Sequence, residues 1–369
     1  MRVQIFSPGR TEIGGNHTDH QHGIVLAAAV NLALTGTAEL NGENVIRVHS
    51  KGYPPDVIDL ADLSVRESER GKSAALIRGV CAWFAEHGYK IGGFNAVTES
   101  SVPSGSGLSS SACFEVAIGN ILAGLFENAV TPVEIALAGQ YAESVYFGKP
   151  CGLMDQMACS VGGIIQIDFR DPNEPIIEKI DFDFEKAGLA LCVTDTGGSH
   201  ADLTDDYAAI PREMREVANH FGKDFLREVE PQKFYAELPN LKLSHRAILR
   251  SIHFFEENER VPKQTAALKD NRIDDFLKLV NQSGRSSFMY LQNVYSNPRE
   301  QGLSLALAIS EKILGGRGAF RVHGGGFAGT IQAFVPLDLL EAYTSEMNRI
   351  FPKCLVLSVS KGGRVESSP

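Results

Sequence analysis

The sequence lacks an apolar run of membrane-spanning length. A transmembrane helix needs about 20 predominantly apolar residues, so we expect no segment that crosses a membrane. The first residues, Met1–Phe6, form a short strand-like stretch and not a secretory signal peptide. Together these absences predict a cytoplasmic protein.

The sequence also lacks a C-x-x-C pair, although six cysteines are scattered over 369 residues. Paired spacings are the usual sign of zinc or redox sites. In a chain of this length we expect the cysteines to be reduced and mostly packed as small apolar groups.

No basic block is present. Lysine and arginine total 35 against 45 aspartates and glutamates, and the net charge is −10. An acidic chain of this kind is a poor candidate for binding nucleic acid or an anionic membrane. Phosphate chemistry stays open, because backbone amides and Mg²⁺ can build a phosphate site.

Internal repeats, low-complexity tracts and flexible linkers are absent as well. The length exceeds what one hydrophobic core usually serves, so we expect two domains that share an interface and meet near residues 185–190. The first half alternates strand-like and helix-like segments, residues 205–293 read as mostly helical, and residues 315–336 return to glycines and strand formers. This order predicts a mixed α/β fold.

Apolar spacing predicts three helices and three strands around the informative segments. The helices are Ser73–His87, Ser109–Phe126 and Thr131–Ser144, and the strands are Phe94–Thr98, Ile164–Asp168 and Leu189–Thr194. We expect serines to cap the start of the second helix.

The most informative segment, Pro103–Ala112, lies between a predicted strand and a predicted helix. Glycines let the backbone approach a ligand closely, and a helix start offers unpaired N–H groups and a positive dipole end. The arrangement favours binding the phosphates of ATP, with hydroxyls available to the phosphates or to Mg²⁺. The candidate residues are Pro103, Gly105, Ser106, Gly107, Leu108, Ser109, Ser110 and Ser111.

Plainer interpretations of this segment exist. A Gly-Ser turn can simply start a helix. It is not a Walker loop, since the only Gly-Lys-Ser, at residues 71–73, has Arg66 where the first glycine belongs. It is not a dinucleotide fingerprint either, because Ser110 replaces the third glycine.

A second glycine cluster, Gly324–Gly329, would alone indicate only a turn between strands. Together with two other segments it resembles the motif set of the GHMP kinases. Residues 8–23 resemble the sugar-binding signature of galactokinases, and Pro103–Ala112 resembles the P-x-G-x-G-L-S-S-S-A phosphate motif. Gly325 and Gly326 then match the C-terminal glycine loop.

The resemblance implies a two-domain fold with the active site between the domains. Residues 1–187 would form a domain like ribosomal protein S5 domain 2, and residues 188–369 a ferredoxin-like domain. It also implies an ATP-dependent, Mg²⁺-dependent kinase that acts on a small molecule, with galactose as the first sugar to consider and transfer to its anomeric hydroxyl.

Catalytic and metal-binding residues are carried over from the resemblance. Cys151–Gln156 matches the family's C-G-I-M-D-Q, which makes Asp155 the catalytic carboxylate and Arg10 its partner. Ser111 and Glu143 would hold Mg²⁺ through oxygen atoms. The implied sugar contacts are Asn16, His17, Asp19, Gly152 and Tyr207.

The first motif departs from the galactokinase pattern at two positions. Where galactokinases have G-E-H-T-D-Y, this chain has Asn16 and His20 in place of the glutamate and the tyrosine. An amide would not repel a 6-carboxylate, and a histidine can add positive charge. Galacturonate is therefore an alternative substrate.

Other interpretations remain open. One alternative is a mevalonate or homoserine kinase of the same superfamily. Another is a catalytically silent protein that senses sugar and ATP. A zinc site formed by His17, His20 and His22 is disfavoured, because no cysteine or further carboxylate completes it. The sequence leaves monomer and homodimer equally open.

Overall fold

Two β-sheets form the framework of the molecule. The computed structural model describes residues 1–103, 107–149, 151–198 and 203–367. In the first sheet the strand order is β12-β1-β2-β5-β3-β4, and β6 pairs with β2 and β7. Only β3 and β5 pair in parallel. The strands are β1 (Arg2–Gly14), β2 (Ile24–Leu40), β3 (Val45–Ser50), β4 (Asp56–Asp59), β5 (Phe94–Ser100), β6 (Ile164–Asp168), β7 (Ile176–Ile180) and β12 (Arg364–Ser367).

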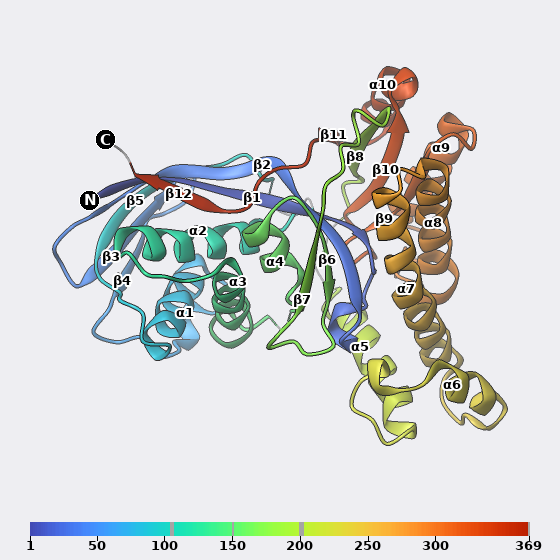
Figure 1. Cartoon of the computed structure of the whole chain (residues 1–369), viewed down its shortest axis with the longest axis horizontal. Helices are drawn as coiled ribbons and strands as arrows, with labels where there is room; N and C mark the ends of the chain where they lie inside the picture. Colours follow the sequence, from blue (N-terminus) through green and yellow to red (C-terminus); the bar gives the residue numbers. More distant parts are fainter. Residues whose placement is uncertain (104–106, 150, 199–202, 368–369) are drawn as a thin grey trace.

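Four helices pack beneath the first sheet (Figure 1). They are α1 (Ser73–Glu86), α2 (Ser110–Leu125), α3 (Pro132–Tyr141) and α4 (Met154–Val161). The start of α3 is fixed by a capping box in which Thr131 and Glu134 bond to each other's backbone N–H, with Pro132 at the first helical position. The helices predicted from residues 73 and 109 are confirmed to within a residue at each end. The third ends earlier than predicted and passes into a π-helical turn, Ala142–Phe147.

The second sheet contains four antiparallel strands in the order β11-β8-β10-β9. They are β8 (Leu189–Asp195), β9 (Ala319–His323), β10 (Thr330–Pro336) and β11 (Lys353–Leu357). Taken from β8 to β11, the chain follows a β-α-β-β-α-β course, which is that of a ferredoxin-like unit. The strand predicted at residues 189–194 is confirmed.

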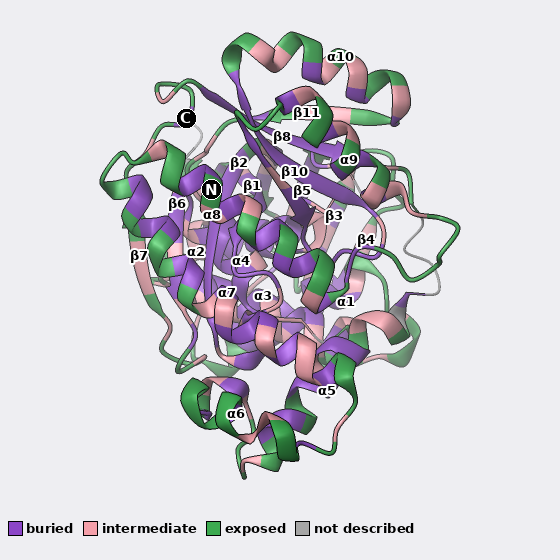
Figure 2. Cartoon of the chain, turned by 90° about the vertical axis from the view of Figure 1, so that its right-hand side faces the viewer, coloured by how far each residue is buried: buried purple, intermediate pink, exposed green. Residues whose placement is uncertain are grey.

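The second half of the chain is mostly helical, as the sequence predicted for residues 205–293. Some of its helices pack on this second sheet, and others pack on the first sheet or on one another. These helices are α5 (Thr204–His220), α6 (Pro231–Glu237), α7 (His245–Lys269), α8 (Ile273–Ser286), α9 (Gly302–Leu314) and α10 (Leu340–Ile350). A second π-helical turn, Ser287–Leu291, follows α8. In Figure 2 the strands β8 and β10 are coloured as buried, whereas β11 and α10 carry exposed and half-buried residues.

One apolar cluster runs through both sheets. It includes Val48 and Leu122 of the first half and Val193 and Phe334 of the second, with Val261 of α7 between them. An apolar interface of this kind holds two units in a fixed arrangement. The division of the chain at residues 187/188 stays a prediction, since β12 returns from the second half to pair with β1.

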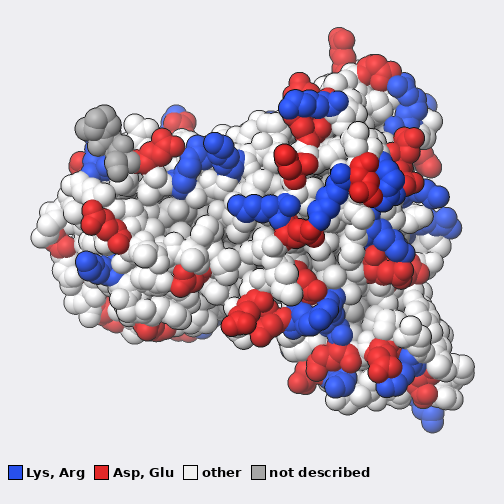
Figure 3. Space-filling model, in the orientation of Figure 1, with Lys and Arg blue, Asp and Glu red and all other residues white. Residues whose placement is uncertain are grey.

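Charges of both signs are mixed on one face of the molecule, and the prediction that the chain binds no nucleic acid or anionic membrane stays a prediction. On the face drawn in Figure 3, Lys and Arg side chains are interspersed with Asp and Glu, and no broad area has one sign. The positive potential that a phosphate needs must therefore come from a local site.

Candidate active site

A bulge in β1 brings Arg10 to the start of α2. The pairing of β1 with β2 shifts register between Pro8 and Arg10, and bulges of this kind redirect a side chain. The Arg10 N–H donates to Leu108 O at 3.1 Å, and its Nη1 donates to Gly107 O. Gly9 allows this approach, because a Cβ there would lie 2.8 Å from Leu108 O. The first two motifs are therefore in direct contact.

The first turn of α2 carries no side-chain cap at its N-cap position. Ser109 occupies that position with φ 57° and ψ 62°, and its hydroxyl makes no capping bond. It donates instead to Oδ2 of Asp155. The predicted serine cap is thus wrong at Ser109, because the left-handed backbone turns the side chain away from the helix. The N–H groups of this turn are left to attract an anion.

Asp155 is held as a carboxylate at this helix start. Its two oxygens accept from Arg10 Nε at 2.7 Å and Nη2 at 2.8 Å, which is a bidentate pair. Burial raises the pKa of Asp155, but Arg10, Ser109 and Lys149 outweigh burial and bring it below its ordinary value. Asp155 is therefore ionised at neutral pH and can accept or orient a hydroxyl proton.

Glu143 lies in the π-helical turn after α3, and such turns are frequent at functional sites. Its Oε1 accepts from Ser111 Oγ at 3.0 Å and from Lys149 Nζ at 3.0 Å. Its Oε2 accepts from Gln156 Nε2 at 2.8 Å. The predicted metal pair, Ser111 and Glu143, is thus brought together. Their oxygens suit a hard cation such as Mg²⁺.

A second carboxylate lies behind Glu143. Gln156 Nε2 also donates to Oε2 of Glu115 at 2.9 Å, so one amide bridges the two glutamates. Burial, and then the charge of Glu143, raises the pKa of Glu115 well above its ordinary value. This shift favours the protonated form of Glu115.

The loop between β1 and β2 contains three of the predicted sugar contacts, Asn16, His17 and Asp19. Thr18 is fully buried and closes the loop, with its hydroxyl donating to Gly15 O and Ile24 O at 2.8 Å each. Asp19 follows it and points at Gly152, where a Cβ would lie 1.6 Å from Oδ2. A glycine is thus required at position 152 for Asp19 to take this position.

Tyr207 joins this group from α5. Its hydroxyl donates to Gly326 O at 2.8 Å, and a Cβ at Gly325 would lie 2.5 Å from its ring. His17 Nε2 donates to Gly325 O at 3.0 Å. The predicted residues of the glycine loop and of the sugar site therefore meet, although the predictions came from distant parts of the sequence.

Asn16 is placed differently from the other predicted contacts. It is fully buried, and its Nδ2 donates to Glu12 Oε1 at 3.0 Å and to Gly324 O at 2.7 Å. Its Oδ1 accepts from Ser287 Oγ at 3.2 Å and from Asn293 Nδ2 at 2.9 Å. All hydrogen-bonding groups of the Asn16 amide are engaged by protein atoms, so none is available to a sugar in this arrangement. The bond to Gly324 O holds the glycine loop in place.

The histidines of this loop are neutral. Burial lowers the pKa of His17 to about 4, and burial followed by the charge of His17 brings the pKa of His20 well below its ordinary value. The positive charge expected from His20 is therefore wrong. Within the described ranges, no group of three or more His, Cys, Asp or Glu side chains is arranged to hold a metal ion.

Two predicted phosphate contacts, Gly105 and Ser106, lie outside the described residues. Of the others, Pro103 lies just before this gap and Ser110 begins α2. Leu108 is fully buried, so only its backbone is available to a ligand.

Comparison with known families identifies the chain. Residues 75–163 match the family model described as GHMP kinases N terminal domain, and residues 2–39 match the galactokinase galactose-binding signature. The chain thus carries the N-terminal domain of the GHMP kinases and the galactose-binding signature of galactokinases. It is a phosphotransferase with an alcohol acceptor, of the galactokinase-like type.

Solved structures confirm the fold of this GHMP kinase. A galactokinase from Lactococcus lactis complexed with galactose superposes with a TM-score of 0.87 at 24% identity, covering 98% of this chain and 94% of that one. A mevalonate kinase from Methanococcus jannaschii gives 0.69 at 15% identity, covering 98% of each. A D-glycero-D-manno-heptose 1-phosphate kinase from Bacteriodes thetaiotaomicron gives 0.67 at 14% identity, covering 100% of this chain and 99% of that one. At these identities the likeness establishes the fold.

No helix in the described part of this GHMP kinase has both the length and the apolar character that crossing a bilayer requires.

Asp19 gives the kinase a pH-dependent stability. Burial, and then the charge of Asp155, raises the pKa of Asp19 from 3.8 to about 7. Because the folded-state pKa is the higher one, the wild type loses stability as pH rises through this range. Asp19→Asn removes the titration. We therefore expect the unfolding free energy of the variant, relative to that of the wild type, to increase by roughly 2 kcal/mol between about pH 5 and pH 7.5. Urea unfolding at both pH values measures this, and an equal shift at both would contradict it.

Sequence reasoning missed three polar residues of the site: Glu115, Lys149 and Gln156. Gln156 is the last residue of the matched motif around Asp155, so its place in the motif was a usable signal. Glu115 lies one turn after Ser111 on α2, where a buried carboxylate has no distinguishing pattern. The sequence spacing of Lys149 from Glu143 does not predict their contact. The two residues meet because the chain between them forms a π-helical turn, which the sequence did not predict.

Proposed function

We propose that this GHMP kinase transfers the γ-phosphoryl group of ATP to the anomeric hydroxyl of galactose, giving galactose 1-phosphate, ADP and a proton. The observation that carries the proposal is the bidentate pair of Arg10 and Asp155 beside the start of α2. It combines an ionised carboxylate for the alcohol with an anion-binding helix end for the nucleotide. The match to the galactose-binding signature supports the choice of sugar.

In this proposal Asp155 holds the hydroxyl in line with the γ-phosphorus and accepts its proton as the new P–O bond forms. The bond between the γ-phosphorus and the β–γ bridging oxygen breaks, and ADP leaves with that electron pair. Arg10 keeps Asp155 ionised and offsets negative charge in the transition state. The backbone after Gly107 and the hydroxyls of Ser110 and Ser111 would contact the phosphates.

Mg²⁺ fits the oxygen-only pair of Ser111 and Glu143, which supports it as the cofactor. Ser111 and Glu143 would hold the ion, and phosphate oxygens and water would supply its other ligands, as is usual for Mg²⁺. When bound, it would supply positive charge to the β- and γ-phosphates.

His17, Asp19 and Tyr207 would surround the sugar on the side of the glycine loop. Both ring nitrogens of His17 are engaged, by His20 Nε2 and by Gly325 O, so His17 would contact the sugar by exchanging one of these bonds. Asp19 accepts from hydroxyls once it is ionised. Gly152 leaves the space that Asp19 needs. Asn16 would act indirectly, through Gly324.

Galacturonate is a less supported substrate. The argument for it rested on an amide at position 16 and a cation at position 20, but Asn16 is engaged by protein groups and His20 is neutral. A carboxylate at the sugar's sixth carbon would gain no counter-charge from either residue.

The test is ADP release from the purified protein with ATP, Mg²⁺ and one acceptor at a time: galactose, galacturonate, glucuronate, N-acetylgalactosamine or mevalonate. We expect galactose to give the highest kcat/KM and phosphorus NMR to locate the phosphate on C1. A higher kcat/KM for galacturonate or mevalonate would replace the proposed substrate. Tight sugar and ATP binding without ADP release would identify a sensor.

A further inference from the structure

Lys149 holds an unusual position for a lysine at this site. Its side chain is 63% exposed, yet its ammonium lies 3.0 Å from an oxygen of Glu143, whose side chain is only 3% exposed. A lysine this exposed has little packing to fix its rotamer. The contact is therefore maintained by charge and can be exchanged for another.

The oxygen that Lys149 contacts is the one that Ser111 also contacts. Ser111 Oγ and Lys149 Nζ both donate to Glu143 Oε1 at 3.0 Å. The ammonium thus occupies space next to the two oxygens that suit a divalent cation. Two positive ions cannot share this carboxylate oxygen at close range without strong repulsion.

The base of the Lys149 side chain is fixed while its tip is free to move. The Lys149 N–H donates to Glu143 O at 3.0 Å. The preceding Gly148 has φ 85°, and a Cβ there would lie 2.4 Å from Nη1 of Arg70. This backbone turn anchors the Cα beside Glu143, so the flexible stem can swing about a fixed point.

The nearby charges offer Lys149 a second role. Arg10 already donates from all three guanidinium nitrogens, to Asp155 and Gly107 O. The Lys149 ammonium lies at the same centre, because the Glu143 oxygen that it contacts also accepts from Ser111 Oγ in the first turn of α2.

We propose that Lys149 is a phosphate-binding residue of this kinase that neutralises Glu143 in the empty site and moves to the nucleotide's polyphosphate when Glu143 takes a divalent cation. The inference rests on the proposed ATP site. In this exchange the ammonium first shields a buried carboxylate and then offsets charge on the transferring phosphoryl group.

Two opposite effects follow for Lys149→Met, which keeps the length of the stem and removes the charge. Glu143 loses a competing cation, so divalent ions should bind more tightly. The phosphoryl group loses a counter-charge, so kcat should fall. A residue with only a structural role would not raise metal affinity and lower turnover together.

The first measurement needs no turnover. Mn²⁺ binding to the nucleotide-free protein is followed by electron paramagnetic resonance. We expect the Mn²⁺ dissociation constant of Lys149→Met to be about tenfold lower than that of the wild type. An unchanged or higher constant would overturn the proposal.

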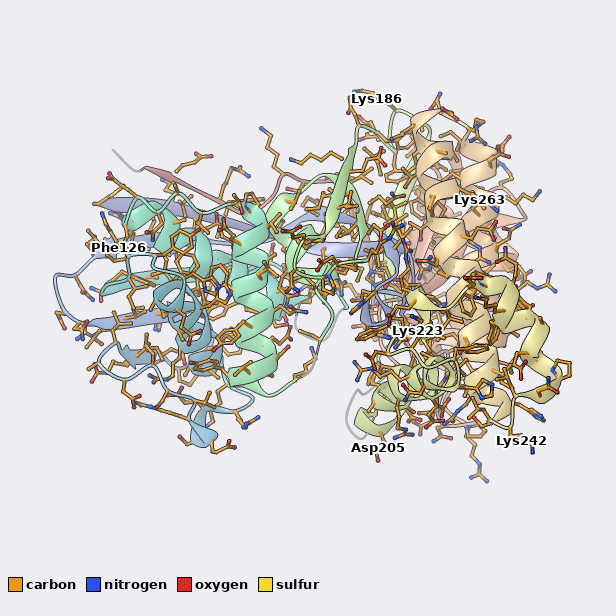
Figure 4. The ribbon with its side chains drawn as sticks, turned by 60° about the horizontal axis from the view of Figure 1, so that its bottom comes forward. Phe126, Lys186, Asp205, Lys223, Lys242 and Lys263 are labelled. Atoms are coloured by element: carbon orange, nitrogen blue, oxygen red, sulfur yellow. The ribbon has the colours of Figure 1, made fainter. Side chains whose placement is uncertain are left out.

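The second measurement is kcat at saturating Mg²⁺ and ATP. We expect Lys149→Met to lose about 10²-fold and Lys149→Arg to retain most of the rate. Lys186→Met is the matched control, because Lys186 is 86% exposed, pairs with Asp183 and lies at the outer edge of the molecule (Figure 4). It should change neither quantity.

An unchanged kcat in Lys149→Met would remove the phosphate-binding role even if metal affinity rises. If the wild type releases no ADP with any acceptor, the proposed function fails. The Mn²⁺ result still decides whether Lys149 competes for Glu143. Circular dichroism melting verifies that each variant is folded, and Lys149→Gln provides a second neutral variant.

Discussion

An Asp155→Asn variant is expected to lose about 10³-fold in kcat while its ATP dissociation constant changes less than about threefold. The amide has the shape of the carboxylate but cannot accept the hydroxyl proton. It also places an NH₂ group against Arg10 or Ser109, which both donate to Asp155 in the wild type. Single-turnover ADP formation with galactose measures the chemical step, and calorimetry measures ATP affinity.

Asp338→Asn is the matched control for this variant. Asp338 is an exposed aspartate that also pairs with an arginine, Arg317, far from the site. Exposed ion pairs contribute little, so kcat should be unchanged. A rate for Asp155→Asn within about threefold of wild type would remove Asp155 from the chemistry.

Arg10→Met is expected to lower kcat by about 10²- to 10³-fold and to move the acidic limb of the pH–rate profile to higher pH. Arg10 is the main group that offsets burial and lowers the pKa of Asp155. Without it that pKa rises, so Asp155 becomes protonated, and activity is lost, at a higher pH than in the wild type. The profile of kcat/KM between about pH 5 and pH 9 measures the shift.

Arg10→Lys distinguishes the effect of the positive charge at position 10 from the effect of the bidentate geometry. Lysine restores a positive charge but not the two parallel bonds, so the acidic limb should return toward its wild-type position while kcat recovers only in part. A loss of kcat in Arg10→Met without any shift of the acidic limb would show that Arg10 does not control Asp155. In the double variant Arg10→Met, Asp155→Asn, the two losses should not add, because the residues act as a unit.

The sequence predicted most of the elements and motifs that surround the site. The helices from residues 73 and 109 and the strand at residue 189 follow from apolar periodicity, because their inward faces are continuous. The motifs around Arg10, Ser111 and Asp155 were found by matching residue patterns. Their proximity was implied by the family resemblance and could not be calculated from spacing.

Other features of the site depend on tertiary contacts, which cannot be predicted from a local sequence pattern. The left-handed backbone of Ser109 directs its hydroxyl to Asp155, which lies 46 residues further along the chain. Asn16 is removed from the sugar site by Ser287 and Asn293, which come from the segment after α8. His20 loses its expected charge through burial, which composition cannot predict.

The pairing of β12 with β1 has a consequence for folding during synthesis. Residues 364–367 pair with Val3–Phe6, so β1 receives its outer neighbour only after residues 364–367 have been synthesised. Until then a growing polypeptide exposes the unpaired edge of its first strand, which is a template for aggregation. A chain that lacks residues 364–367 would keep this edge unpaired, so we expect it to be recovered poorly.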